Sequence, residues 1–245
     1  MALLEPLPIE TLGVPGPFGQ SAGVAHAIQT AEESAPADVQ IGQTGFKGVK
    51  LRKTNAFLEA HPFGTVPAAF SPDGKVGIFE SNSIMRAVAR LGERSFPLYG
   101  RDAYEASRVD SFLDASLVFA RDGQNYLLSL LGGTVSAEIQ SRARNALTTY
   151  LAGINRALLP ERKFLVGDDV TLADICFVAE LGLFFNERTR ARVLDESGMV
   201  PILDTALIDA AHSRAIDHFT RLRKHPAFAP DVEPYLEKIE RAIAA

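Results

Sequence analysis

The pattern of apolar residues changes at residues 92–102, and this change constrains the fold more than any other feature of the sequence. The stretch, GERSFPLYGRD, contains Gly92, Pro97 and Gly100, and such residues interrupt helices and strands. Strand-like and helical runs alternate before it, whereas only helical patterns follow it. The sequence therefore predicts a domain of strands and helices over residues 1–93, a linker over 94–100 and an all-helical domain over 101–245.

In the first domain, short apolar runs with strand character are separated by helical runs. Strands are predicted at 9–14, 37–42, 66–70 and 75–79, and helices at 21–34, 54–60 and 81–91. The segment SPDG at 71–74 joins the last two strands, and its Pro72 and Gly74 favour a hairpin turn. This order predicts a mixed four-stranded sheet with helices packed on it.

The second domain contains longer patterns of helical type. Apolar residues recur every three or four positions over 136–158, as expected of an amphipathic helix. Residues 172–185 are apolar on nearly every face, which indicates a central buried helix. A further helix is predicted from residue 202 to the residues before Pro226.

Composition and charge exclude several classes of protein. The net charge is −5, without the positive bias of a nucleic-acid-binding protein. The N-terminus lacks a basic region and is broken by Pro6 and Pro8, so it is not a secretory signal. No apolar run reaches the roughly 18 residues of a membrane-spanning helix. The single cysteine, Cys176, excludes an intramolecular disulfide and fits a reducing, cytoplasmic location, and the five histidines show no metal-binding spacing.

Pro67 follows Val66 at the start of a predicted strand, which is a position where a strand tolerates proline. A cis bond between the two would turn the chain sharply and leave the backbone N–H and C=O of Val66 facing outward. Those groups could then pair with an extended peptide. The alternative is an ordinary loop proline.

Glu80 and Ser81 lie at the start of the next predicted helix. Ser81 occupies the expected N-cap position. A helix N-terminus with a free hydroxyl and free N–H groups is also an anion site, and Glu80 beside it can take an ammonium group. Together they suit the carboxylate and amine of an amino acid, although Ser81 alone could be a cap with no further role.

These segments carry a resemblance to a known family. HPFGTVPAAF with FESNSIMRAVARL resembles the glutathione-binding half of the cytosolic glutathione transferases, and FLVGDDVTLADICFVAEL resembles their C-terminal half. The final LRKHPAF is also similar, so that the resemblance runs from Ile9 to Phe228. The segments IGQTG, FGTVPAAF and FESNSI look most like the transferase-like domain of the gamma subunit of elongation factor 1B.

The resemblance implies a thioredoxin-like N-terminal domain, an all-helical C-terminal domain and a homodimer. It implies that Val66 pairs with the cysteinyl backbone of glutathione, that Pro67 is cis, and that Glu80 and Ser81 hold the γ-glutamyl end. Lys53 is a candidate for the glycyl carboxylate of the same ligand, with a solvated lysine as the alternative.

The residue that would activate the glutathione thiol departs from the family pattern. The junction VPGPFGQSAGVAHAI, where the first strand meets the first helix, contains no Cys and no Tyr, and Phe18 falls on the position of the serine in serine-type members. Ser21, one helical turn later, is the candidate catalytic hydroxyl, and the backbone N–H groups near Gln20 are a second candidate. Alternatively, the site binds glutathione with little catalysis.

The remaining residues of interest are interpreted wholly or partly as structural. Phe18, Phe119 and Tyr126, with Phe184 and Phe185, are candidates for an apolar acceptor pocket, or else pack in the core. Thr171 and Asp174 match a capping box, which is a folding motif. Cys176 follows on the apolar helix and is predicted to be a small buried side chain.

The sequence thus predicts a glutathione transferase that uses no metal and directs the glutathione thiolate at a small hydrophobic electrophile. The alternative is a weakly catalytic or non-catalytic binding or assembly module of the elongation factor gamma type, which the missing hydroxyl at Phe18 favours.

Overall fold

The computed structural model describes residues 10–12, 55–64, 67–71, 74–91 and 97–244, and for residues 10–12 and 91 it describes the backbone alone. Contacts within the chain divide it into two compact units, Met1–Phe96 and Pro97–Ala245. This division falls within the stretch for which the sequence predicts a linker.

The first unit contains an antiparallel sheet in the order β1-β2-β3. The strands are β1 (Glu10–Leu12), β2 (Ala68–Phe70) and β3 (Gly77–Phe79). Glu10 lies opposite Phe70, and Phe70 lies opposite Gly77. The strand expected at 37–42, which would complete a four-stranded mixed sheet, lies outside the described residues.

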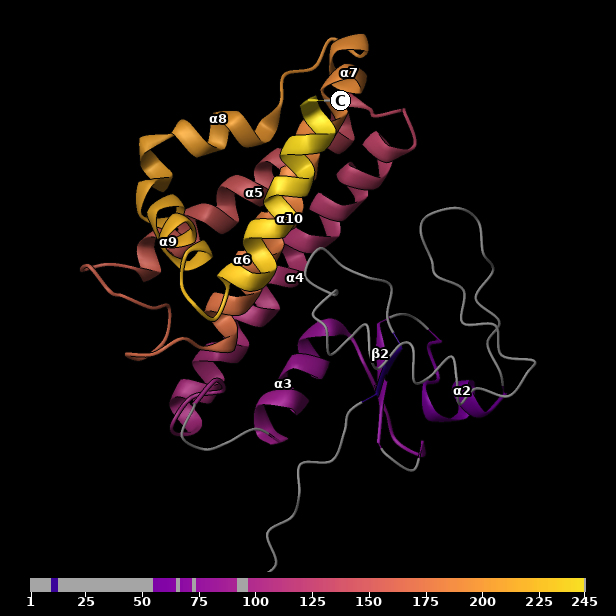
Figure 1. Ribbon diagram of the computed structural model, residues 1–245, viewed down its shortest axis with the longest axis vertical. Helices are drawn as coiled ribbons and strands as arrows, with labels where there is room; N and C mark the ends of the chain where they lie inside the picture. The colour runs from indigo at the N-terminus through magenta and orange to yellow at the C-terminus, as the bar shows by residue number, and fades with distance from the viewer. Residues whose placement is uncertain (1–9, 13–54, 65–66, 72–73, 92–96, 245) are drawn as a thin grey trace, which may run out of the picture. The chain divides into compact units, whose positions relative to one another are not determined.

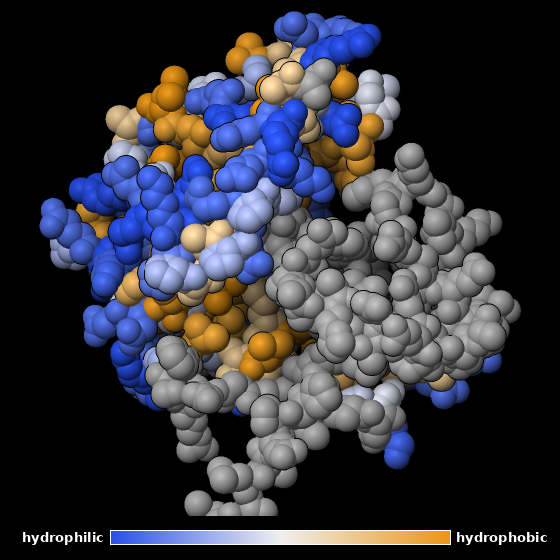
Figure 2. All heavy atoms as spheres, in the orientation of Figure 1, coloured by the Kyte–Doolittle hydropathy of each residue, from blue (hydrophilic) through white to orange (hydrophobic). Residues whose placement is uncertain are grey.

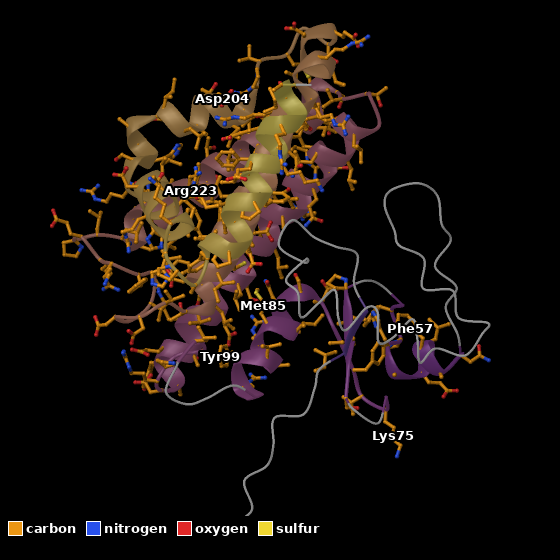
Figure 3. The ribbon with its side chains drawn as sticks, in the orientation of Figure 1. Phe57, Lys75, Met85, Tyr99, Asp204 and Arg223 are labelled. Carbon is orange, nitrogen blue, oxygen red and sulfur yellow. The ribbon has the colours of Figure 1, made fainter. Side chains whose placement is uncertain are left out.

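Aromatic rings hold the described part of this unit together. Helix α2 (Asn55–Ala60) places Phe57 on Phe70 of β2, with ring centroids 5.7 Å apart (Figure 3). His61 stacks on Phe79 of β3 at 4.7 Å. Gly77 permits this packing, because a Cβ atom there would lie 2.3 Å from the carbonyl oxygen of Ala60. A larger residue at Gly77 would therefore push α2 away from the sheet.

Helices form all of the regular structure described in the second unit, as predicted (Figure 1). They are α4 (Ala103–Leu131), α5 (Ala137–Ala157), α6 (Leu172–Phe184), α7 (Ala191–Glu196), α8 (Ile202–Ile208), α9 (Ser213–Arg223) and α10 (Ala229–Ala244), with 3-10 turns η1 (Phe185–Arg190) and η2 (Ala210–His212). Helix α6 is buried at nine of its thirteen positions, which confirms the predicted central helix. Hydrophilic residues cover much of the visible surface of α9 and α10 (Figure 2).

The single helix predicted from residue 202 to Pro226 is wrong, since the chain forms α8, η2 and α9 there. The backbone of Asp209 is extended, with φ −72° and ψ 116°, and its carboxylate accepts from the N–H of Ala211. Asn155 on α5 then accepts from the N–H groups of Arg214 and Ala215 at the start of α9. Side-chain caps thus begin a new helix where the apolar periodicity alone suggests continuation.

The capping box at the start of α6 is present and buried. Asp174 is fully buried, and it accepts from the N–H of Thr171 at 3.0 Å and from the N–H of Leu165 at 3.1 Å. The same carboxylate also accepts from the Thr171 hydroxyl at 3.1 Å and lies 2.9 Å from Nε2 of His218. Arg221, a donor only, bonds to Nδ1 of His218, so Nε2 carries the proton that Asp174 accepts. The motif therefore joins α6 to α9.

Candidate functional site

The turn from β3 into helix α3 (Ser81–Leu91) forms the candidate site. Glu80 adopts φ 67°, a left-handed conformation that is uncommon for residues other than glycine. Its carbonyl oxygen accepts from the N–H groups of Ser83 at 2.9 Å and Ile84 at 3.0 Å. The first bond of the helix therefore starts from Glu80, which occupies the cap position.

This geometry corrects one prediction, because Ser81 is the first residue of the helix and not its N-cap. The left-handed turn at Glu80 starts the helix one residue earlier than predicted. The residue types in this segment do not signal that backbone conformation. Glu80 and Ser81 are both exposed. Their side chains are therefore accessible at the beginning of α3.

The start of α3 has the chemistry of a site for an amino-acid end. The first N–H groups of any helix lack partners within that helix, and the helix dipole adds partial positive charge there. The first turn of α3 contains no acidic residue that would compete for these groups. A carboxylate can bind to the N–H groups and the Ser81 hydroxyl, while the Glu80 carboxylate can bind an ammonium group.

The register of the sheet brings Pro67 to the same place. Ala68 of β2 lies opposite Phe79 of β3, so the residues flanking this pair, Pro67 and Glu80, lie at the same end of the sheet. Pro67 is half-buried and directly precedes β2. Residues separated by thirteen positions in the sequence thus meet at one end of the sheet.

Four predicted site residues lie outside the described residues: Val66, Lys53, Ser21 and Phe18. Their roles stay predictions. Of the residues predicted to bind glutathione, the described part of the chain contains Pro67, Glu80 and Ser81, and it brings these three together.

The predicted acceptor-pocket residues Phe119 and Tyr126 lie on α4 in the core of the helical unit. Their exposed fractions are 2% and 0%. Phe119 stacks on Tyr150 at 5.1 Å, and the Tyr126 hydroxyl donates to Glu187 at 2.7 Å. Phe184 and Phe185 are buried too. These contacts are those of core residues, and an acceptor pocket at these positions stays a prediction.

Sequence reasoning missed a buried carboxylate in this core. Glu187 on η1 accepts from the Tyr126 hydroxyl and from the N–H groups of Ile202 at 2.8 Å and Leu203 at 2.7 Å. Burial raises the pKa of Glu187, and these hydrogen bonds oppose the shift. Its donors lie 15 to 61 residues away in the sequence, so no local pattern signals them. The network ties α4, η1 and α8 together.

Among the described residues, no group of three or more His, Cys, Asp or Glu residues is arranged to hold a metal ion. No helix among the described residues is long and apolar enough to cross a membrane.

Residues 111–200 match the family model of the glutathione S-transferase C-terminal domain. Elongation factor 1-gamma 1 of Oryza sativa subsp. japonica is 33% identical over 157 residues, which are 63% of this chain and 36% of that protein. Glutathione S-transferase F9 of Arabidopsis thaliana is 30% identical over 156 residues, or 59% of this chain and 66% of that protein. The chain thus spans about a third of the length of its elongation factor relatives.

Solved structures show the same fold. A delta-class glutathione transferase of Nilaparvata lugens superposes with a TM-score of 0.53 at 20% identity, covering 78% of this chain and 80% of that one. A glutathione S-transferase of Methylobacterium radiotolerans, in complex with glutathione sulfonate, gives 0.54 at 20% identity over 90% and 92%. The family model identifies residues 111–200 as a glutathione S-transferase C-terminal domain, and the two solved structures show that the chain has the fold of glutathione transferases.

Proposed function

We propose that the chain binds glutathione at the start of α3 and directs its thiolate at a small hydrophobic electrophile. The observation that carries the proposal is the meeting of Pro67 with Glu80 and Ser81 at one end of the sheet. The end of a strand next to a helix N-terminus suits a peptide with an amino-acid end. The solved relative that contains glutathione sulfonate supports this choice of ligand.

The proposed roles follow the chemistry of each group. The Ser81 hydroxyl and the first N–H groups of α3 bind the γ-glutamyl carboxylate, and Glu80 binds the ammonium group next to it. The backbone of Val66 pairs with the cysteinyl residue, after a cis bond to Pro67, and Lys53 meets the glycyl carboxylate. Ser21 stabilises the thiolate.

The same proposal includes the wider architecture. Residues 1–93 form a thioredoxin-like domain with a mixed four-stranded sheet, and residues 101–245 form the helical domain. Phe18, Phe119 and Tyr126 border the acceptor pocket. The protein is a cytoplasmic homodimer that uses glutathione as cosubstrate and no metal.

A second function is supported by a separate observation. Several of the similar proteins are elongation factor 1-gamma chains, and Phe18 replaces the usual hydroxyl of the serine-type enzymes. The domain would then bind glutathione weakly or not at all, and it would serve in assembly with another protein. The two functions differ in whether an electrophile is consumed.

Calorimetric titration of reduced glutathione into the wild type and into Ser81→Ala tests the leading proposal. We expect saturable binding that weakens by about 1 kcal/mol or more in the variant, the scale of a hydrogen bond to a charged group. Ser111→Ala is the control, because the Ser111 hydroxyl donates within its own helix to the carbonyl of Ser107. Absence of binding to the wild type at millimolar glutathione would exclude the transferase and leave the assembly module.

A further inference from the structure

Five exposed cations on neighbouring segments of the helical unit form what we call the basic surface. Its members are Arg156 in the last turn of α5, Arg162 and Lys163 in the following loop, and Arg214 and Arg221 on α9. Helix α5 packs on α9 (Figure 1). Asn155, next to Arg156, accepts from the N–H of Arg214 at 2.8 Å, and the Lys163 carbonyl accepts from the Arg221 side chain. The three segments therefore hold these cations close together.

The cations of the basic surface lack the carboxylate partners that other cations of this unit have. Arg188 pairs with Asp204, and Arg223 pairs with Glu233. By contrast, none of the five forms an ion pair with any residue that the structure describes. Their charge is thus left for a partner outside this part of the chain.

The excess of positive charge is local. Residues 156–163 and 213–221 contain two carboxylates, Glu161 and Asp217, against the five cations, whereas the whole chain has a net charge of −5. Like charges that lie close together repel one another, and a bound anion relieves that repulsion. The basic surface is therefore complementary to an anionic partner.

Arg221 is held in position for such a partner. Its Nη2 bonds to the Lys163 carbonyl oxygen and lies 2.7 Å from Nδ1 of His218. The guanidinium carbon lies 5.6 Å from the centroid of the Phe164 ring, and Nζ of Lys163 lies 5.4 Å from the same centroid. The Nε and Nη1 atoms carry three more N–H donors, which no described group accepts. A guanidinium fixed in this way loses little freedom when it binds a carboxylate.

The spacing of the cations favours an extended ligand. Arg214 and Arg221 are seven residues apart on α9, so they lie on one face of the helix, roughly 10 Å apart along its axis. A single phosphate or carboxylate is too small to contact both. In an extended strand, alternate side chains point the same way about every 6.7 Å, so several acidic residues in one segment can reach them together. The net negative charge of the chain disfavours a nucleic acid, whose phosphates are repelled by it.

We propose that the basic surface binds an extended acidic segment of another protein. Carboxylates of that segment accept hydrogen bonds from Arg214 and from the three remaining donors of Arg221. Arg156, Arg162 and Lys163 add attraction from the side of α5. The surface contains no residue of the proposed glutathione site except none that lies in the first unit, so it does not depend on glutathione binding.

Fluorescence anisotropy of a labelled peptide of five Glu-Ser repeats, titrated with the full chain, tests the proposal. The neutral probe is the same peptide with glutamine in place of glutamate. We expect the acidic peptide to bind at least about tenfold more tightly than the neutral one, with an affinity that falls as salt is raised from about 0.05 to about 0.3 M.

Charge reversal locates the binding. Arg162→Glu/Arg214→Glu should weaken binding of the acidic peptide at least about tenfold. The matched control, Lys238→Glu/Arg241→Glu, changes the net charge equally at exposed cations of α10 and should weaken binding less than about twofold. Circular dichroism establishes that both variants are folded. Glutathione should bind to both as it does to the wild type, which separates this surface from the site at α3.

The comparison of the two peptides on the wild type needs no variant, and equal affinities for them would overturn the proposal. An equal loss of affinity in the two double variants would also overturn it, because the attraction would then come from net charge alone. A thymidine decamer that binds more tightly than the acidic peptide would overturn the choice of partner in favour of a nucleic acid.

Discussion

The starts of helices α3 and α6 place similar residues in opposite environments. At α6, Thr171 and Asp174 are buried, and the Asp174 carboxylate is saturated by donors from this chain. At α3, Ser81 and Glu80 are exposed, and the first turn has no acidic side chain of its own. A hydroxyl and a carboxylate at a helix start therefore stabilise the fold in one place and are left accessible to a ligand in the other.

The strongest test of this comparison removes the buried carboxylate. Asp174→Ala leaves the N–H groups of Leu165 and Thr171 and the ring of His218 without their acceptor, so we expect the free energy of unfolding to fall by about 3–5 kcal/mol. Urea denaturation measures the change. The exposed Asp217 provides the control, and Asp217→Ala should change stability by less than about 0.5 kcal/mol. A loss below about 1 kcal/mol for Asp174→Ala would contradict the structural role.

The next prediction concerns the pH dependence of stability. Burial raises the pKa of Glu180 to about 7 from an ordinary value near 4.3, so the folded state holds this proton more tightly than the unfolded state. The stability that Glu180 contributes is complete below pH 4 and is lost as the pH rises to about 7, by roughly 3 kcal/mol. Denaturation of the wild type and of Glu180→Gln at several pH values measures it. The difference between them should shrink with decreasing pH, and a constant difference would contradict the prediction.

The third prediction separates the two helix starts directly. Ser81 follows the cap position, so Ser81→Ala should lower stability by less than about 0.5 kcal/mol while it weakens glutathione binding about fivefold or more. Thr171→Ala should do the reverse, with a loss of about 0.5–2 kcal/mol in stability and unchanged affinity. Melting temperatures and calorimetry on both variants provide the measurements. If both variants changed stability and glutathione affinity in the same way, the two helix starts would not differ as predicted.

The smallest expected effect concerns backbone strain at Glu80. Its φ of 67° is a conformation that glycine adopts at no steric cost. Glu80→Gly should therefore stabilise the fold by about 0.5–1 kcal/mol, and at the same time weaken glutathione binding through the loss of the carboxylate. Glu80→Gln keeps the strain and serves as the control for the lost charge. A destabilised glycine variant would show that the conformation carries no cost.

Local patterns in the sequence were sufficient for much of the helical unit. The periodicity over 136–158 predicted α5, found at Ala137–Ala157, because one face of that helix is buried along its whole length. The capping box of Thr171 and Asp174 followed from residue types three positions apart. The break at Asp209 was missed, since an aspartate within an amphipathic pattern is also compatible with the exposed face of a continuous helix.

The candidate sites were less accessible to sequence reasoning. Glu80 and Ser81 were recognised, but the left-handed backbone of Glu80 moved the cap by one residue, which side-chain type cannot reveal. The meeting of Pro67 with Glu80 depends on the register of two strands. The environment of Glu187 and Glu180 depends on helices far apart in the sequence, so burial of these carboxyl groups emerges only from the packed structure.

Nuclear magnetic resonance with ¹⁵N-labelled protein tests the central claim most directly. Reduced glutathione is titrated while the backbone amides at the starts of α3 and α6 are followed. The account predicts that the amide signals of Ser81 and Asn82 shift saturably, whereas those of Leu172 and Ala173 stay in place. Unchanged signals at Ser81 and Asn82 at millimolar glutathione would contradict the claim that the start of α3 is the binding site.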